Sequence, residues 1–213
     1  MATFEKGILG GFSGKVGNVV GSRWRGKNIM RSLPQRGKYT PSTKQEEQRE
    51  KFKKVISFLS PIVDILSQYF GSPQGDKSRS NLATSYHLKN AVVSTPQGML
   101  MDYAKVLISK GDLRGLDGAT VAAAAGRLLN LNWQDNSGQG KATNTDALMA
   151  VVYAPDLNLF YSGTNLAVRD ATAVSITLPP FMLGFEVEVW ASFYKPDTNF
   201  AANSTYLGAV TVV

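Results

Sequence analysis

Histidine and cysteine, which often supply acid–base and nucleophilic chemistry, are almost absent from this sequence of 213 residues. His87 is the single histidine, and there is no cysteine. These counts exclude a disulfide framework, a cysteine nucleophile, a thiolate metal site and a multi-histidine metal site. A Ser-His-Asp triad would depend on His87 alone, and no Gly-x-Ser-x-Gly turn is present to position a serine. We therefore expect His87 to pack within a helical segment or to lie on its surface.

Residues 7–15, Gly-Ile-Leu-Gly-Gly-Phe-Ser-Gly-Lys, have the composition of a phosphate-binding loop. Such a loop continues with serine or threonine and opens a helix. Here Val16 follows, and the pattern becomes strand-like. The segment is therefore interpreted as a glycine-rich arm.

The carboxylates are scattered along the chain, and Glu186 and Glu188 point to the same face of one predicted strand. Such a pair either binds a cation or is solvated, and the solvated state is favoured. Turn-like contexts rich in Gly and Asn, where aspartate commonly bonds to nearby backbone, surround Asp112, Asp117, Asp135 and Asp146. The sequence predicts no catalytic residue, no metal site, no cofactor and no small-molecule substrate.

Positive charge is concentrated near the N-terminus. Residues 1–54 contain 13 of the 23 Lys and Arg and 4 of the 16 Asp and Glu, so their net charge is +9 and that of the remaining 159 residues is −2. A basic segment of this density attracts phosphates, lipid headgroups or an acidic protein surface. Alternatively, the basic side chains are solvated or face acidic groups on the rest of the chain.

The basic residues around Trp24 alternate along a strand-like run. This alternation predicts Arg23, Arg25 and Lys27 on one face and Trp24 on the other. A basic face beside a stacking ring suits a phosphate backbone. The alternative is an exposed hairpin whose basic face blocks edge-to-edge aggregation. The candidate phosphate contacts are Arg23, Arg25, Lys27, Arg31, Arg36 and Lys38.

The elements that carry these residues begin with a β-hairpin. Strand-like runs over 16–20 and 29–33 flank a turn near Gly26. Seven glycines in 7–33 weaken this sheet, since each lacks a side chain to pack, so we expect it to need a partner surface.

Helical spacing follows the connector at 34–41. Thr43 and Glu46 predict a capping box that opens the first helix. Ser60-Pro61 predicts a kink or a restart, and a further helix is expected over 79–92.

The C-terminal half has the period-two pattern of strands. Strands are predicted over residues 104–109, 119–132, 147–153, 157–161, 171–178, 185–194 and 206–213. This number of short strands is typical of an immunoglobulin-like or fibronectin-like β-sandwich. The predicted fold class is α+β and mostly β, with residues 1–102 as a basic hairpin arm plus helical region and 103–213 as the sandwich. An arrangement in which both halves share one core stays open.

Several short motifs occur together. They are Gly-Gly-Phe-Ser-Gly-Lys-Val-Gly-Asn-Val-Val-Gly at 10–21, Trp-x-Gly at 24–26, Ile-Met-Arg-Ser-Leu-Pro at 29–34, Thr-x-Gln at 43–45, Arg-x-Lys-Phe at 49–52 and Tyr-x-Gly at 206–208. With these, the whole chain resembles a family of uncharacterised proteins, a domain of unknown function widespread in Bacteroidota. The resemblance implies a bacterial or phage source and transfers no catalytic residue, because the family has no established activity.

Four classes of function are weighed. The leading hypothesis is a non-enzymatic structural or assembly protein, a filament, surface or virion component, that forms a homo-oligomer or polymer through its arm and its sheet edges. Its predicted contacts are the apolar residues of the arm, Phe12, Val16, Val19, Val20, Trp24, Ile29 and Met30. The alternative is a nucleic-acid-associated protein that uses the basic hairpin. A glycan-binding sandwich using Trp133 or Trp190 rests on fold analogy, and an enzyme ranks last.

The N-terminal residues lack the charged and apolar regions of a classical signal peptide. No apolar run approaches the roughly 20 residues that span a bilayer. We therefore expect cytoplasmic synthesis, with later release or incorporation into a virion left open.

Overall fold

The computed structural model describes residues 2–4, 11–35, 37, 40–96 and 98–213. The chain divides into two compact units, Met1–Glu46 and Glu47–Val213. The predicted boundary between residues 102 and 103 therefore lies inside the second unit.

The first unit is a small antiparallel sheet with the strand order β1-β4-β3-β2. Its strands are β1 (Ala2–Phe4), β2 (Gly14–Val16), β3 (Val19–Trp24) and β4 (Lys27–Ser32). The predicted hairpin is confirmed, because β3 and β4 pair directly across a turn made by Arg25 and Gly26. Both turn residues have positive φ, 48° and 80°. A two-residue turn of this kind matches the twist of the two strands that it joins, and its positive φ angles favour glycine.

The helical region begins at α1 (Thr43–Leu59), and the N–H of Ser42 donates to the Gln45 side chain at 3.0 Å. The side chain that caps this helix start is therefore that of Gln45, bonded to Ser42, and the predicted pair Thr43 and Glu46 is wrong by one residue. The expected break at Pro61 is a short turn, η1, before the chain resumes as α2. The remaining bounds are η1 (Ser60–Ile62), α2 (Val63–Tyr69) and α3 (Arg79–Asn90). Within the described residues, no helix has both the length and the apolarity needed to cross a bilayer.

Seven strands form two sheets of the second unit, with the orders β10-β9-β12-β13 and β11-β8-β7. The strands are β7 (Asp117–Ala124), β8 (Leu128–Gln134), β9 (Ala147–Ala154), β10 (Leu159–Gly163), β11 (Ala173–Thr177), β12 (Glu186–Tyr194) and β13 (Thr205–Thr211). Short turns η3 (Arg169–Ala171) and η4 (Pro180–Met182) lie between them. Leu131, Val152, Val189 and Phe193 belong to the apolar core of this sandwich. The predicted immunoglobulin-like sandwich, three strands on four, is confirmed.

Two strand predictions are wrong. The run 119–132 is two strands, β7 and β8, because Gly126 and Arg127 adopt positive φ at a turn. The run 104–109 begins as the turn η2 (Tyr103–Lys105) and continues as irregular chain with a bend at Ile108. Ile108 is buried there and its N–H donates to the Ser204 hydroxyl at 2.9 Å. The apolar alternation over 104–109 thus reflects burial of side chains. It does not mark a strand, because the Ile108 N–H bonds to a side chain and not to a neighbouring strand. A separate hairpin, β5 (Val92–Thr95) with β6 (Gly98–Met101), comes just before this segment.

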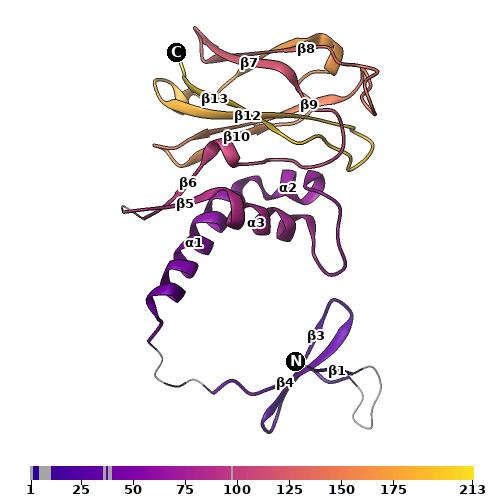
Figure 1. Cartoon of the computed structure of the whole chain (residues 1–213), viewed down its shortest axis with the longest axis vertical. Coiled ribbons are helices and arrows are strands. Elements are labelled where there is room, and N and C mark those ends of the chain that lie inside the picture. Colours follow the sequence, from indigo (N-terminus) through magenta and orange to yellow (C-terminus); the bar gives the residue numbers. More distant parts are fainter. Residues whose placement is uncertain (1, 5–10, 36, 38–39, 97) are drawn as a thin grey trace. The chain divides into compact units, whose positions relative to one another are not determined.

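The outer face of the four-stranded sheet is covered by the helices. Phe58 and Leu66 of the helical region share one core with Met149, Val151 and Trp190 of the sheet. Every residue of β9 is buried, and β12 is buried from Val187 onward. The second unit therefore has three layers, a helical layer, a four-stranded sheet and a three-stranded sheet, as Figure 1 shows.

Candidate functional site

The predicted basic residues lie on both faces of the N-terminal sheet. Directly paired residues share a face, and the register pairs Trp24 with Lys27, and Val20 with both Arg31 and Lys15. Trp24 therefore lies on the same face as Lys15, Lys27 and Arg31. Arg23 lies on the opposite face.

The prediction of Arg23, Arg25 and Lys27 on one face is wrong for this reason. The chain reverses at Arg25 and Gly26, so strand alternation does not continue through the turn. Arg25 lies in the turn, with its guanidinium carbon 4.9 Å from the centre of the Trp24 ring. Arg36 and Lys38, the two other candidate phosphate contacts, lie outside the described residues.

The predicted assembly contacts differ in exposure. Val16 and Trp24 are 58% and 48% exposed, whereas Ile29 is buried. Phe12 packs over Gly21, where an added Cβ would lie 2.5 Å from its ring. The half-buried members of the predicted set are Phe12, Val19, Val20 and Met30. Val16 and Trp24 are thus the two most available for a contact with another molecule.

The charge of the molecule coincides with the division into units. Residues 1–46 contain nine basic and two acidic residues, which accounts for the whole formal charge of +7. Residues 47–213 contain 14 of each and are formally neutral. The electrostatic attraction of this protein for an anionic partner therefore originates in the N-terminal unit.

His87 has a packing role. It is fully buried, its Nδ1 donates to the Ala83 carbonyl at 2.8 Å, and its Nε2 accepts from the Leu107 N–H at 3.2 Å. Burial lowers the pKa of His87 below its ordinary value. The Nδ1 bond lies within α3, and the Nε2 bond joins α3 to the segment after η2, so both ring nitrogens are engaged within the protein.

Three residues considered for surface roles are buried. Glu188 is 7% exposed and accepts a 2.5 Å hydrogen bond from the Tyr206 hydroxyl, so the expectation that it is solvated is wrong. Burial, and then the bond to Glu188, raise the pKa of Tyr206. Trp133 and Trp190 are core residues, and their indole N–H groups donate to the carbonyls of Arg169 and Tyr103. Neither tryptophan is available to bind a glycan.

A buried polar network lies at one end of the sandwich. The Arg169 guanidinium is fully buried, pairs with Asp146 and donates to the Asn136 side chain. Asn136 in turn donates to Asp117 at 2.8 Å, which also accepts from Arg114 at 2.7 Å. Hydrogen bonds from Asn136 and then Arg114 lower the pKa of Asp117. Five polar side chains from separated segments therefore form one connected network.

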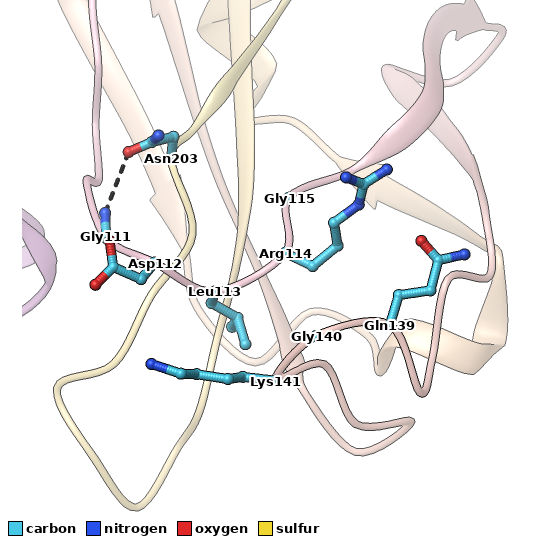
Figure 2. Close-up of a pocket in the computed structure, with 9 residues that line it drawn as sticks. All are labelled: Gly111, Asp112, Leu113, Arg114, Gly115, Gln139, Gly140, Lys141 and Asn203. Carbon is cyan, nitrogen blue, oxygen red and sulfur yellow. Dashed lines mark hydrogen bonds between the residues drawn. The ribbon is translucent and has the colours of Figure 1, made fainter.

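This network anchors the loop that lines an open pocket. Arg169 donates to the Arg114 carbonyl and Asn136 donates to the Gly115 carbonyl, each at 2.9 Å. The pocket has a volume of about 560 Å³, within the roughly 300–1,000 Å³ common for small-ligand sites. The lining residues, shown in Figure 2, are Gly111, Asp112, Leu113, Arg114, Gly115, Gln139, Gly140, Lys141 and Asn203.

Sequence reasoning did not find this pocket. The sequence predicts turn contexts for Asp112, Asp117, Asp135 and Asp146, and Asp135 and Asp146 do accept nearby backbone N–H groups. The turn-rich composition of 111–118 and 135–146 is the one signal that marks these loops. It does not say that they meet, because Asp146 and Arg169 are 23 positions apart.

Two solved structures each match about half of the chain. A two-domain fibronectin type-III segment of chicken tenascin shares 16% identity, with 47% of this chain and 50% of that one covered and a TM-score of 0.36. The fibronectin type-III domain of the human collagen α-1(XX) chain also shares 16% identity, with 49% and 89% covered and a TM-score of 0.33. The match thus spans half the length of the tenascin segment.

No protein of curated function matches the sequence. A family described as one of unknown function, DUF6266, matches residues 11–208. This match covers most of both compact units. The chain therefore belongs to the DUF6266 family.

Proposed function

We propose that this protein is a non-enzymatic structural component that assembles by strand addition, in which the N-terminal sheet of one copy pairs with a sheet edge of the next. The observation that carries this proposal is the edge strand β2, all three residues of which are exposed. β2 pairs with β3 on one side and is the last strand in the order of its sheet. An open edge offers main-chain donors and acceptors to another chain.

The backbone groups of Lys15 are the ones directed outward. Val16 and Val19 flank a two-residue turn and are paired with each other. Residues in that position exchange hydrogen bonds, so the neighbouring pair, Lys15 with Val20, is a non-bonded pair of the ladder. The N–H and C=O of Lys15 consequently point away from β3.

Charge favours a head-to-tail arrangement. Two N-terminal units, each carrying the whole +7 charge of its chain, would repel one another. The second unit is formally neutral. The edge strands of its two sheets are β10 and β13, and β7 and β11. Contacts between unlike surfaces form rings or open filaments, so the expected product is a filament, a surface layer or part of a virion.

The test measures the solution mass of the nuclease-treated protein by light scattering. We expect the wild-type chain at several times 23.1 kDa and the Lys15→Pro variant at 23.1 kDa, because proline removes the outward N–H. Lys15→Thr is the matched control, since it removes the same charge but keeps the N–H, and it should still assemble. Deletion of residues 1–33 should also give a folded monomer. A monomeric wild type, or equal assembly of the proline and threonine variants, would contradict the proposal.

A second function is favoured by one observation: Trp24 shares a sheet face with Lys15, Lys27 and Arg31. An aromatic ring among cations is the arrangement that binds single-stranded nucleic acid, by stacking and by phosphate contacts. With three cations, the affinity for a single-stranded oligonucleotide should fall with salt at a logarithmic slope of about −2.

The face assignment supplies the control for this second function. Lys27→Glu and Arg31→Glu should weaken oligonucleotide binding more than Arg23→Glu, which changes the opposite face by the same charge. Affinity that does not depend on salt, or an equal loss in all three variants, would contradict phosphate binding by this face.

A further inference from the structure

We propose that the pocket between the loops 111–115 and 139–141 and Asn203 binds a neutral saccharide. All of its residues belong to the second unit, so this site is independent of the N-terminal sheet and of the assembly proposed above. Figure 2 shows Asp112 and Asn203 on one side, Arg114 and Gln139 on the other, and Lys141 running beneath Leu113.

The first argument is that the walls of the pocket are held in place. Asn203 accepts from the Gly111 N–H at 3.2 Å, and Leu113 N–H donates to the Ala201 carbonyl at 3.3 Å. From behind, Arg169 and Asn136 hold the carbonyls of Arg114 and Gly115. The opposite loop is tied to the same network, because the Gln139 N–H donates to the Asn136 carbonyl at 3.3 Å. The backbone of both walls is therefore fixed before a ligand binds, which reduces the entropy lost on binding.

The second argument is the unused hydrogen-bonding capacity of the lining. Among the described residues, no hydrogen bond or ion pair engages the Asp112 carboxylate, the Gln139 amide, the Lys141 ammonium or the Asn203 NH₂ group. These groups offer acceptors at Asp112 and Gln139 and donors at Gln139, Lys141 and Asn203. The four residues that carry these groups all line the pocket of about 560 Å³.

The third argument is the mixture of charges, which selects the chemistry of the ligand. The Asp112 carboxylate repels an anionic ligand, and the Lys141 ammonium repels a cationic one. Arg114 adds little net charge, because its guanidinium pairs with Asp117 at 2.7 Å. A hydroxyl group both donates and accepts, so a ligand rich in hydroxyls can satisfy both kinds of lining group without a net charge of its own.

The position of Lys141 is stabilised by a cation–π contact with an aromatic ring. The Lys141 ammonium lies over the Phe200 ring, 5.0 Å from its centre. Asp112 and Asn203 also line an adjoining hollow of about 290 Å³ together with Phe200. Asp112 and Asn203 thus border both hollows, and an oligosaccharide, with a second sugar unit in the adjoining hollow, would use more of this surface than a single sugar.

The test is saturation-transfer NMR of the full chain with four neutral trisaccharides: maltotriose, cellotriose, chitotriose and mannotriose. We expect transfer to at least one of them, with affinity that does not change between low and high salt, because no net charge is neutralised. Asn203→Ala should weaken that binding about tenfold or more, since it removes a donor to the ligand. If none of the four trisaccharides binds, the proposal is wrong.

The effect of Asp112→Asn separates a saccharide from an anion. Loss of a charged acceptor should weaken saccharide binding, whereas an anionic ligand such as pyrophosphate would bind more tightly once the carboxylate is neutralised. Asp64→Asn, at an exposed position on α2, is the matched control and should leave binding unchanged. Thermal melting confirms that each variant is folded. Binding that survives both pocket substitutions, or that strengthens in Asp112→Asn, would overturn the proposal.

Discussion

Arg169 donates two hydrogen bonds to the same carboxylate oxygen of Asp146, from Nε at 3.1 Å and from Nη2 at 3.0 Å, where neither side chain reaches solvent. The guanidinium also lies 4.0 Å from the centre of the Phe193 ring. Taking both charges out of water is costly, and the pair offsets that cost only because every partner is in place. The structural result is a rigid end of the sandwich that holds the loops of the pocket.

Removal of one member of this pair should be strongly destabilising. Asp146→Ala leaves the Arg169 charge buried without a partner, and we expect the free energy of unfolding to fall by about 3–5 kcal/mol. Chemical denaturation measures this change, with the exposed neighbour Asp170→Ala as the control. A change within about 1 kcal/mol for Asp146→Ala would show that the pair is not buried.

Stability should depend on pH through His87. Because burial lowers the folded-state pKa of His87 below its ordinary 6.5, the unfolded chain takes up the proton first on acidification. The free energy of unfolding is then highest above pH 6.5 and falls below it, by at most about 1.4 kcal/mol per pH unit. His87→Gln, which keeps one donor and one acceptor, should flatten the profile between pH 5 and 7. An unchanged slope in this variant would contradict the assignment, since no other histidine is present.

The helices and the sandwich should unfold together. Phe58 of α1 contacts the rings of Tyr153 and Phe160 in the sheet, each at a centroid distance of 5.1 Å. Phe58→Ala should lower the free energy of unfolding by about 3–5 kcal/mol and leave a single transition for far-UV and near-UV circular dichroism. Phe52→Ala, at a half-exposed position on the same helix, is the control. Two separated transitions would show that the layers are independent.

The N-terminal sheet should be sensitive at Gly21. A methyl group there would lie 2.5 Å from both the ring and the carbonyl oxygen of Phe12, so the backbone must move. We expect Gly21→Ala to destabilise this sheet by about 1–3 kcal/mol and to accelerate tryptic cleavage between Arg23 and Arg31. Gly37→Ala, where the methyl would meet no described atom within 4 Å, serves for comparison. Equal cleavage rates in the two variants would argue against the contact.

Local signals in the sequence predicted most of the elements. The turn at Gly26, the break at Pro61 and the period-two strands from 147 onward depend on backbone preferences and on nearby residues. The number of strands then favoured a sandwich, because such strands bury their apolar faces against a second sheet. The errors near Arg25 and over 104–109 occurred where the chain reverses, or where its backbone bonds to a side chain.

Composition and short-range pattern were enough to predict the hairpin, the helical region, the sandwich and the concentration of positive charge in residues 1–54. Only the folded chain shows that Glu188 and Trp190 are buried, that Trp24 shares a face with Lys27, and that Arg169 meets Asp146. Contacts of this kind join residues brought together by chain folding. Their pairing depends on which loops come into contact, and no local periodicity specifies that.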